Sequence, residues 1–175
     1  TISIDAQGSD LVMAGVTNIT ATDSSVRLNA ANNVVLSNII ATDVSVIADT
    51  GSIINGVGST MNVSAMNLRL TAGDTIATST RHLTTMIDTL SASSTAGIFI
   101  TETDNLTVGS VAVNVTQVNA DATSSVSSDA AQSGLTTLGS NGHIVLTTNN
   151  GAIVINQGVV AQGAGDILVA ANGSD

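Results

Sequence analysis

Two short stretches decide the fold, HIVLTTNNG at residues 143–151 and DILVAANG at residues 166–173. In each, a polar residue precedes a short apolar run and an Asn/Gly turn closes it, and the two apolar runs start at Ile144 and Ile167. A unit of this size cannot bury its apolar face alone and has to stack on a similar unit. The pair therefore predicts a solenoid with a repeat of about 23 residues.

A similar apolar motif recurs along the whole chain. It starts at Ile2, Val26, Val44, Leu68, Ile98, Ile144 and Ile167. Most of these starts are about one period apart, the step from Leu68 to Ile98 is longer, and we interpret the step from Ile98 to Ile144 as two periods with a weak copy at Val118–Ala122. Strands of about 4 to 6 residues joined by short turns give three strands per step, as in a parallel β-helix. We expect about eight coils of roughly 18–24 residues, which at ~4.8 Å per coil form a rod of roughly 40 Å.

Composition favours the same all-β fold. The chain has no Pro and one aromatic residue, Phe99, so its core has to be made of Val, Ile, Leu and Ala. Small branched side chains suit a narrow interior, and uninterrupted ladders suit a chain without Pro. The Asn/Gly turns are also typical of two-residue hairpins, so an antiparallel sandwich or barrel is the structural alternative. No composition shift divides the chain, and we expect one segment over residues 1–175.

Two segments depart from the repeat. Ala77–Gly97 contains apolar residues that fit either helical or strand spacing, so we expect a coil with an excursion whose secondary structure the pattern does not decide. Asp121–Gly142 is rich in Ser, Ala and Thr and has little strand signal, which predicts a long surface loop.

Charge and length exclude several functions. Thirteen acidic residues against three arginines and no lysine give a formal charge of −10. Such a surface repels nucleic acid and anionic membranes, so we expect no nucleic-acid partner. No apolar run approaches the ~18 residues that a membrane span needs, and without cysteine no disulfide or thiolate metal site can form.

Three stretches carry a resemblance to a known family: TIAT at Thr75–Thr78, IDTLSA at Ile87–Ala92 and GIFITETDNLTVG at Gly97–Gly109. They resemble the repeats of very large bacterial exoproteins of the filamentous-haemagglutinin type, and a similar texture covers most of the chain. The resemblance implies a right-handed parallel β-helix that serves as the shaft of a giant adhesin, located outside the cell or on the bacterial surface. The secretion domain expected at the N-terminus of such proteins is not found in this sequence.

Few residues suggest chemistry. Glu102 and Asp104 alternate along one expected strand, so both carboxylates would project from one face and could bind calcium; a solvated strand face explains them equally. His82 and His143 are far apart and are expected as exposed turn residues without a metal. Arg27 and Arg69 are expected to point outward and to pair with acids. We therefore predict no catalytic residue, no cofactor and no metal beyond those two calcium candidates.

The expected function is mechanical. The chain would be a shaft segment that extends a binding tip or offers weak multivalent adhesion, with neighbouring repeats, copies of itself, surface glycans or matrix as partners. One alternative is a filament protomer that joins copies end to end through the open edges of its coils. The others are a carbohydrate-acting β-helix enzyme and an ice-binding protein that uses Thr-x-Thr ladders.

Overall fold

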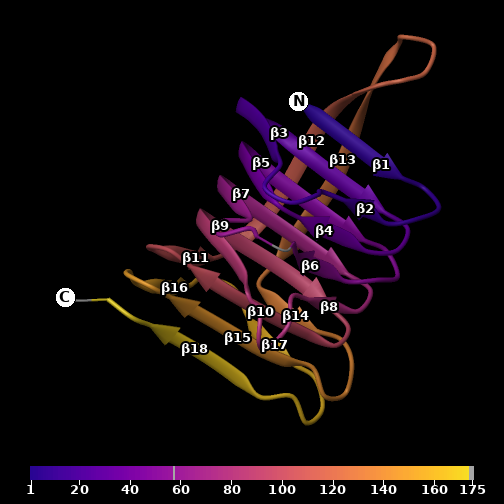
Figure 1. The fold of residues 1–175 in the computed structure, drawn as a ribbon. Coiled ribbons are helices and arrows are strands. Elements are labelled where there is room, and N and C mark those ends of the chain that lie inside the picture. The colour runs from indigo at the N-terminus through magenta and orange to yellow at the C-terminus, as the bar shows by residue number, and fades with distance from the viewer. Residues whose placement is uncertain (57, 174–175) are drawn as a thin grey trace.

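The chain folds into a parallel β-helix. The computed structural model describes residues 1–56 and 58–173, and every regular element in that part is a β-strand. The strands are β1 (Ile2–Ala6), β2 (Leu11–Val12), β3 (Asn18–Ala30), β4 (Val34–Leu36), β5 (Asn38–Ala48), β6 (Ile53–Asn55), β7 (Val63–Ala72), β8 (Thr75–Ile76), β9 (Leu83–Ser94), β10 (Gly97–Glu102), β11 (Leu106–Val108), β12 (Ser110–Val118), β13 (Ser124–Ser133), β14 (Leu135–Thr137), β15 (His143–Thr148), β16 (Ile153–Ile155), β17 (Val159–Ala161) and β18 (Ile167–Ala171). Figure 1 shows them, apart from β12 and β13, stacked as rungs from β1 to β18. The fold class predicted from the sequence is confirmed, while the hand of the coil stays a prediction.

The number of coils follows from one column of stacked interior residues, which contains one residue from each coil. It runs through β2, β4, β6, β8, β10, β15 and β18 and consists of Leu11, Val34, Ile53, Ile76, Ile98, Ile144 and Ile167. The described residues thus form seven coils rather than about eight, which shortens the rod to about 34 Å at ~4.8 Å per coil. All of these side chains are buried except Ile167, which belongs to the last coil.

A second interior column shows where the predicted rhythm was wrong. It consists of Ile2, Val26, Val44, Leu68, Leu90, Val108 and Ile155. Leu68 pairs with Leu90 in the next coil, whereas Ile98 pairs with Ile76 on another side of the coil. The long step from Leu68 to Ile98 therefore joins two different sides. Both sides carry the same apolar alternation, so the pattern alone cannot separate them.

The long step from Ile98 to Ile144 is one coil that contains an insertion. Ile98 pairs directly with Ile144, and no rung lies between them at Val118–Ala122. The inserted part is the antiparallel hairpin of β12 and β13, which extends from Ser110 to Ser133. Without the hairpin, this step is close in length to the next coil, from Ile144 to Ile167. The coil count was too high because we divided this step in two.

The two segments that depart from the repeat are mostly strand. In Ala77–Gly97, only the turn before Leu83 leaves the coil, and it is closed by a bridge between Thr78 and Arg81. The rest is β9, whose inward residues alternate as in a strand, so the helical spacing was coincidental. Asp121–Gly142 is not one long loop, because it contains β13 and then β14, which returns to the coil. Its Ser-rich strand pairs with β12 through its backbone, which gives no apolar signal in the sequence.

The long strands β3, β5, β7 and β9 each turn a corner. The ladder between β3 and β5 is broken between Ala21 and Ser25, and the strands bend there from one side of the coil to the next. Tight turns connect the other sides. At Gly73 an added Cβ would lie 2.4 Å from the backbone oxygen of Asp49, so the stacked turns approach too closely for a side chain.

The hairpin lies along the outside of the coil. It contacts β1, β3, β5, β7 and β9, and Figure 1 shows its turn projecting past β1. Val111, Val113 and Val115 on β12 are buried in this contact. Beneath them is an outward column in which serine and arginine alternate: Ser3, Arg27, Ser45, Arg69 and Ser91. The small serines leave room for the valines, and the arginines supply polar anchors.

Candidate functional site

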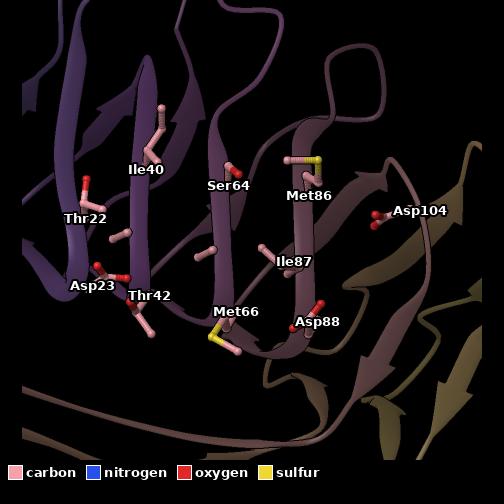
Figure 2. A pocket seen from close by; sticks show the side chains of 12 residues that line it. Thr22, Asp23, Ile40, Thr42, Ser64, Met66, Met86, Ile87, Asp88 and Asp104 are labelled. Atoms are coloured by element: carbon pink, nitrogen blue, oxygen red, sulfur yellow. The ribbon is translucent and has the colours of Figure 1, made fainter.

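A shallow groove lies where the long strands bend. It has a volume of about 460 Å³ and runs across β3, β5, β7 and β9 on the outside of the coil. Its lining consists of Thr22, Asp23, Ile40, Ala41, Thr42, Ser64, Ala65, Met66, Met86, Ile87, Asp88 and Asp104. Figure 2 shows the labelled side chains projecting from these neighbouring strands, with Asp23 on β3, Asp88 on β9 and Asp104 on the adjoining loop. Three other surface hollows of the described residues are smaller, at about 120, 240 and 180 Å³.

The groove combines apolar and acidic side chains. Ile40, Met66 and Met86 line it with exposed apolar side chains, and Ile39 and Ile87, which stand next to Ile40 and Met86, are buried in the core. Methionine is flexible and polarisable and adapts to ligands of irregular shape. Asp23 and Asp88 supply carboxylate oxygens, which accept hydrogen bonds, and no lining residue is basic. The surface can accept hydroxyl donors beside an apolar face, and it repels anions.

The backbone at one side of the groove has an unusual conformation. Asp23 has a φ of 54°, in the left-handed region that residues other than glycine rarely adopt. Asp and Asn tolerate this region better than most residues. It allows β3 to turn its corner within one residue, and the turn places the Asp23 carboxylate beside the groove.

The two calcium candidates do not share a face, which corrects the prediction from alternation. β10 ends at Glu102, so Asp104 lies in the bend that follows and the strand alternation no longer applies. Glu102 is fully buried inside the coil, whereas Asp104 is exposed at the groove. A single buried carboxylate and a separate exposed one do not form a calcium site.

Glu102 instead joins adjacent turns of the coil. Its Oε1 accepts hydrogen bonds from the backbone N–H groups of Thr103 (2.8 Å) and Ile87 (3.2 Å), and the Thr85 hydroxyl donates to Oε2 (2.5 Å). Burial raises the pKa of the Glu102 carboxyl, and the hydrogen bonds from Thr85 and the backbone oppose this shift. The residue is therefore a polar connection inside the core rather than a ligand facing solvent.

The two histidines remain far apart. His143 is exposed, as predicted, and accepts a hydrogen bond from the Asp166 backbone N–H at its Nδ1 (3.0 Å). His82 is only half exposed, because its ring packs beside Phe99 with ring centres 6.0 Å apart. Its Nδ1 lies 2.9 Å from the Thr101 hydroxyl. Each ring thus has a structural neighbour in the adjacent coil.

Arg27 and Arg69 both bind the hairpin, but only Arg27 pairs with an acid as predicted. Arg27 Nε donates to both carboxylate oxygens of Asp129, at 3.1 and 3.0 Å, and both side chains are largely buried. Arg69 Nε donates to the backbone oxygen of Ala130 (3.2 Å). The sequence could not identify Asp129 as the partner, since it lies 102 residues from Arg27.

The groove was missed at the sequence level, although a weak signal exists. Ile40, Ser64 and Met86 form one outward column, and Ile40 and Met86 each stand next to an inward isoleucine. Pairs of adjacent apolar residues in a strand indicate that one of the two faces outward. The signal becomes specific only when the register of the coils is known.

Within residues 1–56 and 58–173, no group of three or more His, Cys, Asp and Glu side chains is placed to hold a metal ion. No helix long and apolar enough to cross a membrane is found in the same residues. Comparison with known proteins gives no matching family model, no matching curated protein and no matching solved structure.

Proposed function

We propose that this chain is a segment of the shaft of a large secreted or surface-attached bacterial adhesin. The observation that supports this is the repeated interior column, in which Ile98, Ile144 and Ile167 stack directly on one another in successive coils. A coil of this kind can be repeated many times without any change of fold. Each added coil extends the molecule by ~4.8 Å, and length is what a shaft provides.

In this proposal the groove gives the shaft a weakly adhesive surface. Its exposed Met66 and Met86 fit the C–H faces of a neutral sugar, and Asp23 and Asp88 fit its hydroxyl groups. The acidic lining and the charge of −10 disfavour sulfated or sialylated glycans. Repeated grooves along a shaft would convert weak single contacts into avidity. We propose binding and spacing rather than catalysis, and release of reducing sugar from oligosaccharides by the purified chain would contradict this.

Immunogold labelling of cells that produce the full-length protein tests the shaft. Antibodies against residues 1–175 should label thin rods that project from the cell surface or are shed from it. Labels confined to the cell interior, or to compact particles without rods, would overturn the proposal. A separate test of the adhesive surface measures the binding of neutral glycans to the purified chain. Met66→Asp changes the groove and should weaken binding, whereas Leu138→Asp is the control at an exposed position that does not line the groove. Equal binding by both variants would exclude the groove as the binding site.

A further inference from the structure

A buried carboxylate interrupts an apolar column of the core. At one inward position, successive rungs place Ile19, Ile39 and Val63, and the next two rungs place Thr85 and Glu102. Glu102 is as fully buried as Ile39 and Val63. A carboxylate at such a position destabilises the fold unless hydrogen bonds compensate for its burial. The position therefore has a role that an apolar residue could not fill.

The backbone ladder has a gap beside this carboxylate. Among the described residues, pairing between β9 and the coil that follows it stops at Glu102 and resumes at Thr107. The β9 residues that face the gap are Met86, Ile87 and Asp88, and all three line the groove. The groove therefore opens where the ladder is missing, and backbone pairing does not fix the separation of its walls there.

Glu102 bridges the gap with its side chain. Its Oε1 accepts a hydrogen bond from the backbone N–H of Ile87 at 3.2 Å and a longer one from the N–H of Asp104 at 3.4 Å. Both donors line the groove, and Figure 2 shows Ile87 on its strand and Asp104 on the adjoining loop. In a continuous parallel ladder, the Ile87 N–H would bond to the backbone of the next strand. The carboxylate takes the place of that backbone and joins two walls through one oxygen atom.

The carboxylate is itself held in one orientation. The Thr85 hydroxyl donates to Oε2 at 2.5 Å, and the backbone N–H of Thr103 donates to Oε1 at 2.8 Å. The Thr103 hydroxyl in turn donates to the Thr85 backbone oxygen at 2.9 Å. A buried network with its partners satisfied is rigid, so the position of Oε1 is fixed.

We propose that Glu102 is the positioning residue of the groove: from inside the core it sets the separation between the β9 wall and the Asp104 loop, and thereby the fit of a ligand. The inference rests on the adhesive groove proposed above and adds the residue that shapes it. Met86 and Asp88 flank Ile87 and supply an apolar surface and a carboxylate of the same wall. Glu102 is fully buried and does not contact the ligand, so it acts through the two backbone N–H groups.

Two variants of similar length separate hydrogen bonding from packing. Glu102→Gln keeps an oxygen that accepts from the Ile87 and Asp104 N–H groups, whereas Glu102→Met fills the same space with only a weak acceptor. In hydrogen exchange followed by NMR, the Ile87 amide should exchange roughly 10- to 100-fold faster in Glu102→Met and at the wild-type rate in Glu102→Gln. The Met86 methyl resonance should shift in Glu102→Met alone, and that of the buried Met13 should not respond.

Binding of cellohexaose, a neutral oligosaccharide, measures the effect on the groove. A titration followed by the methyl resonances of Met66 and Met86 should give a dissociation constant about tenfold higher for Glu102→Met and an unchanged one for Glu102→Gln. Thr148→Val is the matched control, because it changes a polar residue of the same column in the next coil, outside the groove. It should alter neither exchange at Ile87 nor binding.

Three results would overturn the inference. They are an Ile87 amide that exchanges at the wild-type rate in Glu102→Met, an equal acceleration at Leu28 and Val46 in distant coils, which indicates a general loss of stability, and a Glu102→Gln variant as impaired as Glu102→Met. Glu102→Val, with the residue type of Val63, repeats the test if Glu102→Met does not fold. Absence of cellohexaose binding by the wild type would count against the adhesive surface and not against this inference, which the exchange rates decide.

Discussion

Asp129→Ala should release the hairpin from the coil and leave the coil folded. The Asp129 carboxylate holds the Arg27 guanidinium through two hydrogen bonds of 3.1 and 3.0 Å, and the side chains are 8% and 13% exposed. The variant leaves the Arg27 charge covered by the hairpin without a partner. Removing one member of a buried ion pair costs about 3 to 5 kcal/mol. The remaining exposure of Arg27 lets water screen the charge, so about 3 kcal/mol is the appropriate magnitude.

The loss should appear in the hairpin alone. β12 and β13 are an insertion into one coil, so they can lift away without unwinding it. A two-stranded hairpin is marginal in water on its own, and once lifted it loses the protection of its cross-strand amides. At 1.36 kcal/mol per factor of ten, about 3 kcal/mol accelerates their hydrogen exchange about a hundredfold.

Hydrogen–deuterium exchange measured by mass spectrometry resolves this. Peptides from Ser110–Ser133 should exchange faster in Asp129→Ala, while peptides from β10 and β15 stay protected. Asp88→Ala makes the same change of charge at an exposed position lining the groove and should leave the hairpin unchanged. The double variant Arg27→Met with Asp129→Leu replaces the pair by apolar side chains and should restore protection. Unchanged exchange in Asp129→Ala, or equal acceleration in β10 and β15, would refute the reasoning.

Three further predictions concern the same regions. Burial raises the pKa of Glu102 above its ordinary value of 4.5, so Glu102 contributes most to stability below pH 4.5, and this contribution is lost as the pH rises through the folded pKa. Glu102→Gln does not ionise and should avoid this loss of stability. In urea titrations it should therefore be more stable than the wild type at pH 7 but not at pH 4. Ser45 and Ser91 are buried and, within the described residues, their hydroxyls have no hydrogen-bond partner. Ser45→Ala and Ser91→Ala should each keep the free energy of unfolding or raise it by up to about 1 kcal/mol. A decrease in the free energy of unfolding by more than about 1 kcal/mol would show that the hydroxyl has a partner. Deleting Ser110–Ser133 and joining Gly109 to Gly134 leaves a coil of ordinary length and should preserve the strand signal in circular dichroism, whereas loss of cooperative unfolding would show that the coil needs the hairpin.

The sequence was sufficient for the fold because the interior columns repeat. Ile144 and Ile167 were identified as stacked strands from their spacing, and the structure pairs them. Position within the coil could not be predicted, because Leu68 and Ile98 present the same alternation on different sides. A periodic core determines that units stack, but identical columns on two sides leave the assignment of each unit to a side undetermined.

The groove and the hairpin contacts depend on information that one strand does not contain. Glu102 and Asp104 alternate correctly for a strand, and they separate only because β10 ends between them. Asp129 lies in a Ser-rich stretch whose strand forms by backbone pairing with β12, without an apolar face of its own. Met66 and Met86 could be assigned to a groove only after the corner of each long strand had been located. In each case the outcome depends on where a strand ends or bends, which is the least regular part of a repeat.

The hairpin also affects the coil that follows it. It leaves the ladder between Val108 and Leu135, and the next coil is interrupted at the same place, between Ile155 and Val159. Gly134 has a φ of 72° there, and a Cβ on it would lie 2.1 Å from the Gly158 oxygen, so the break in one rung is packed against the break in the next. The insertion therefore interrupts the ladder on this side in two successive rungs, whereas β10, β15 and β18 on another side of the same coils pair without a break.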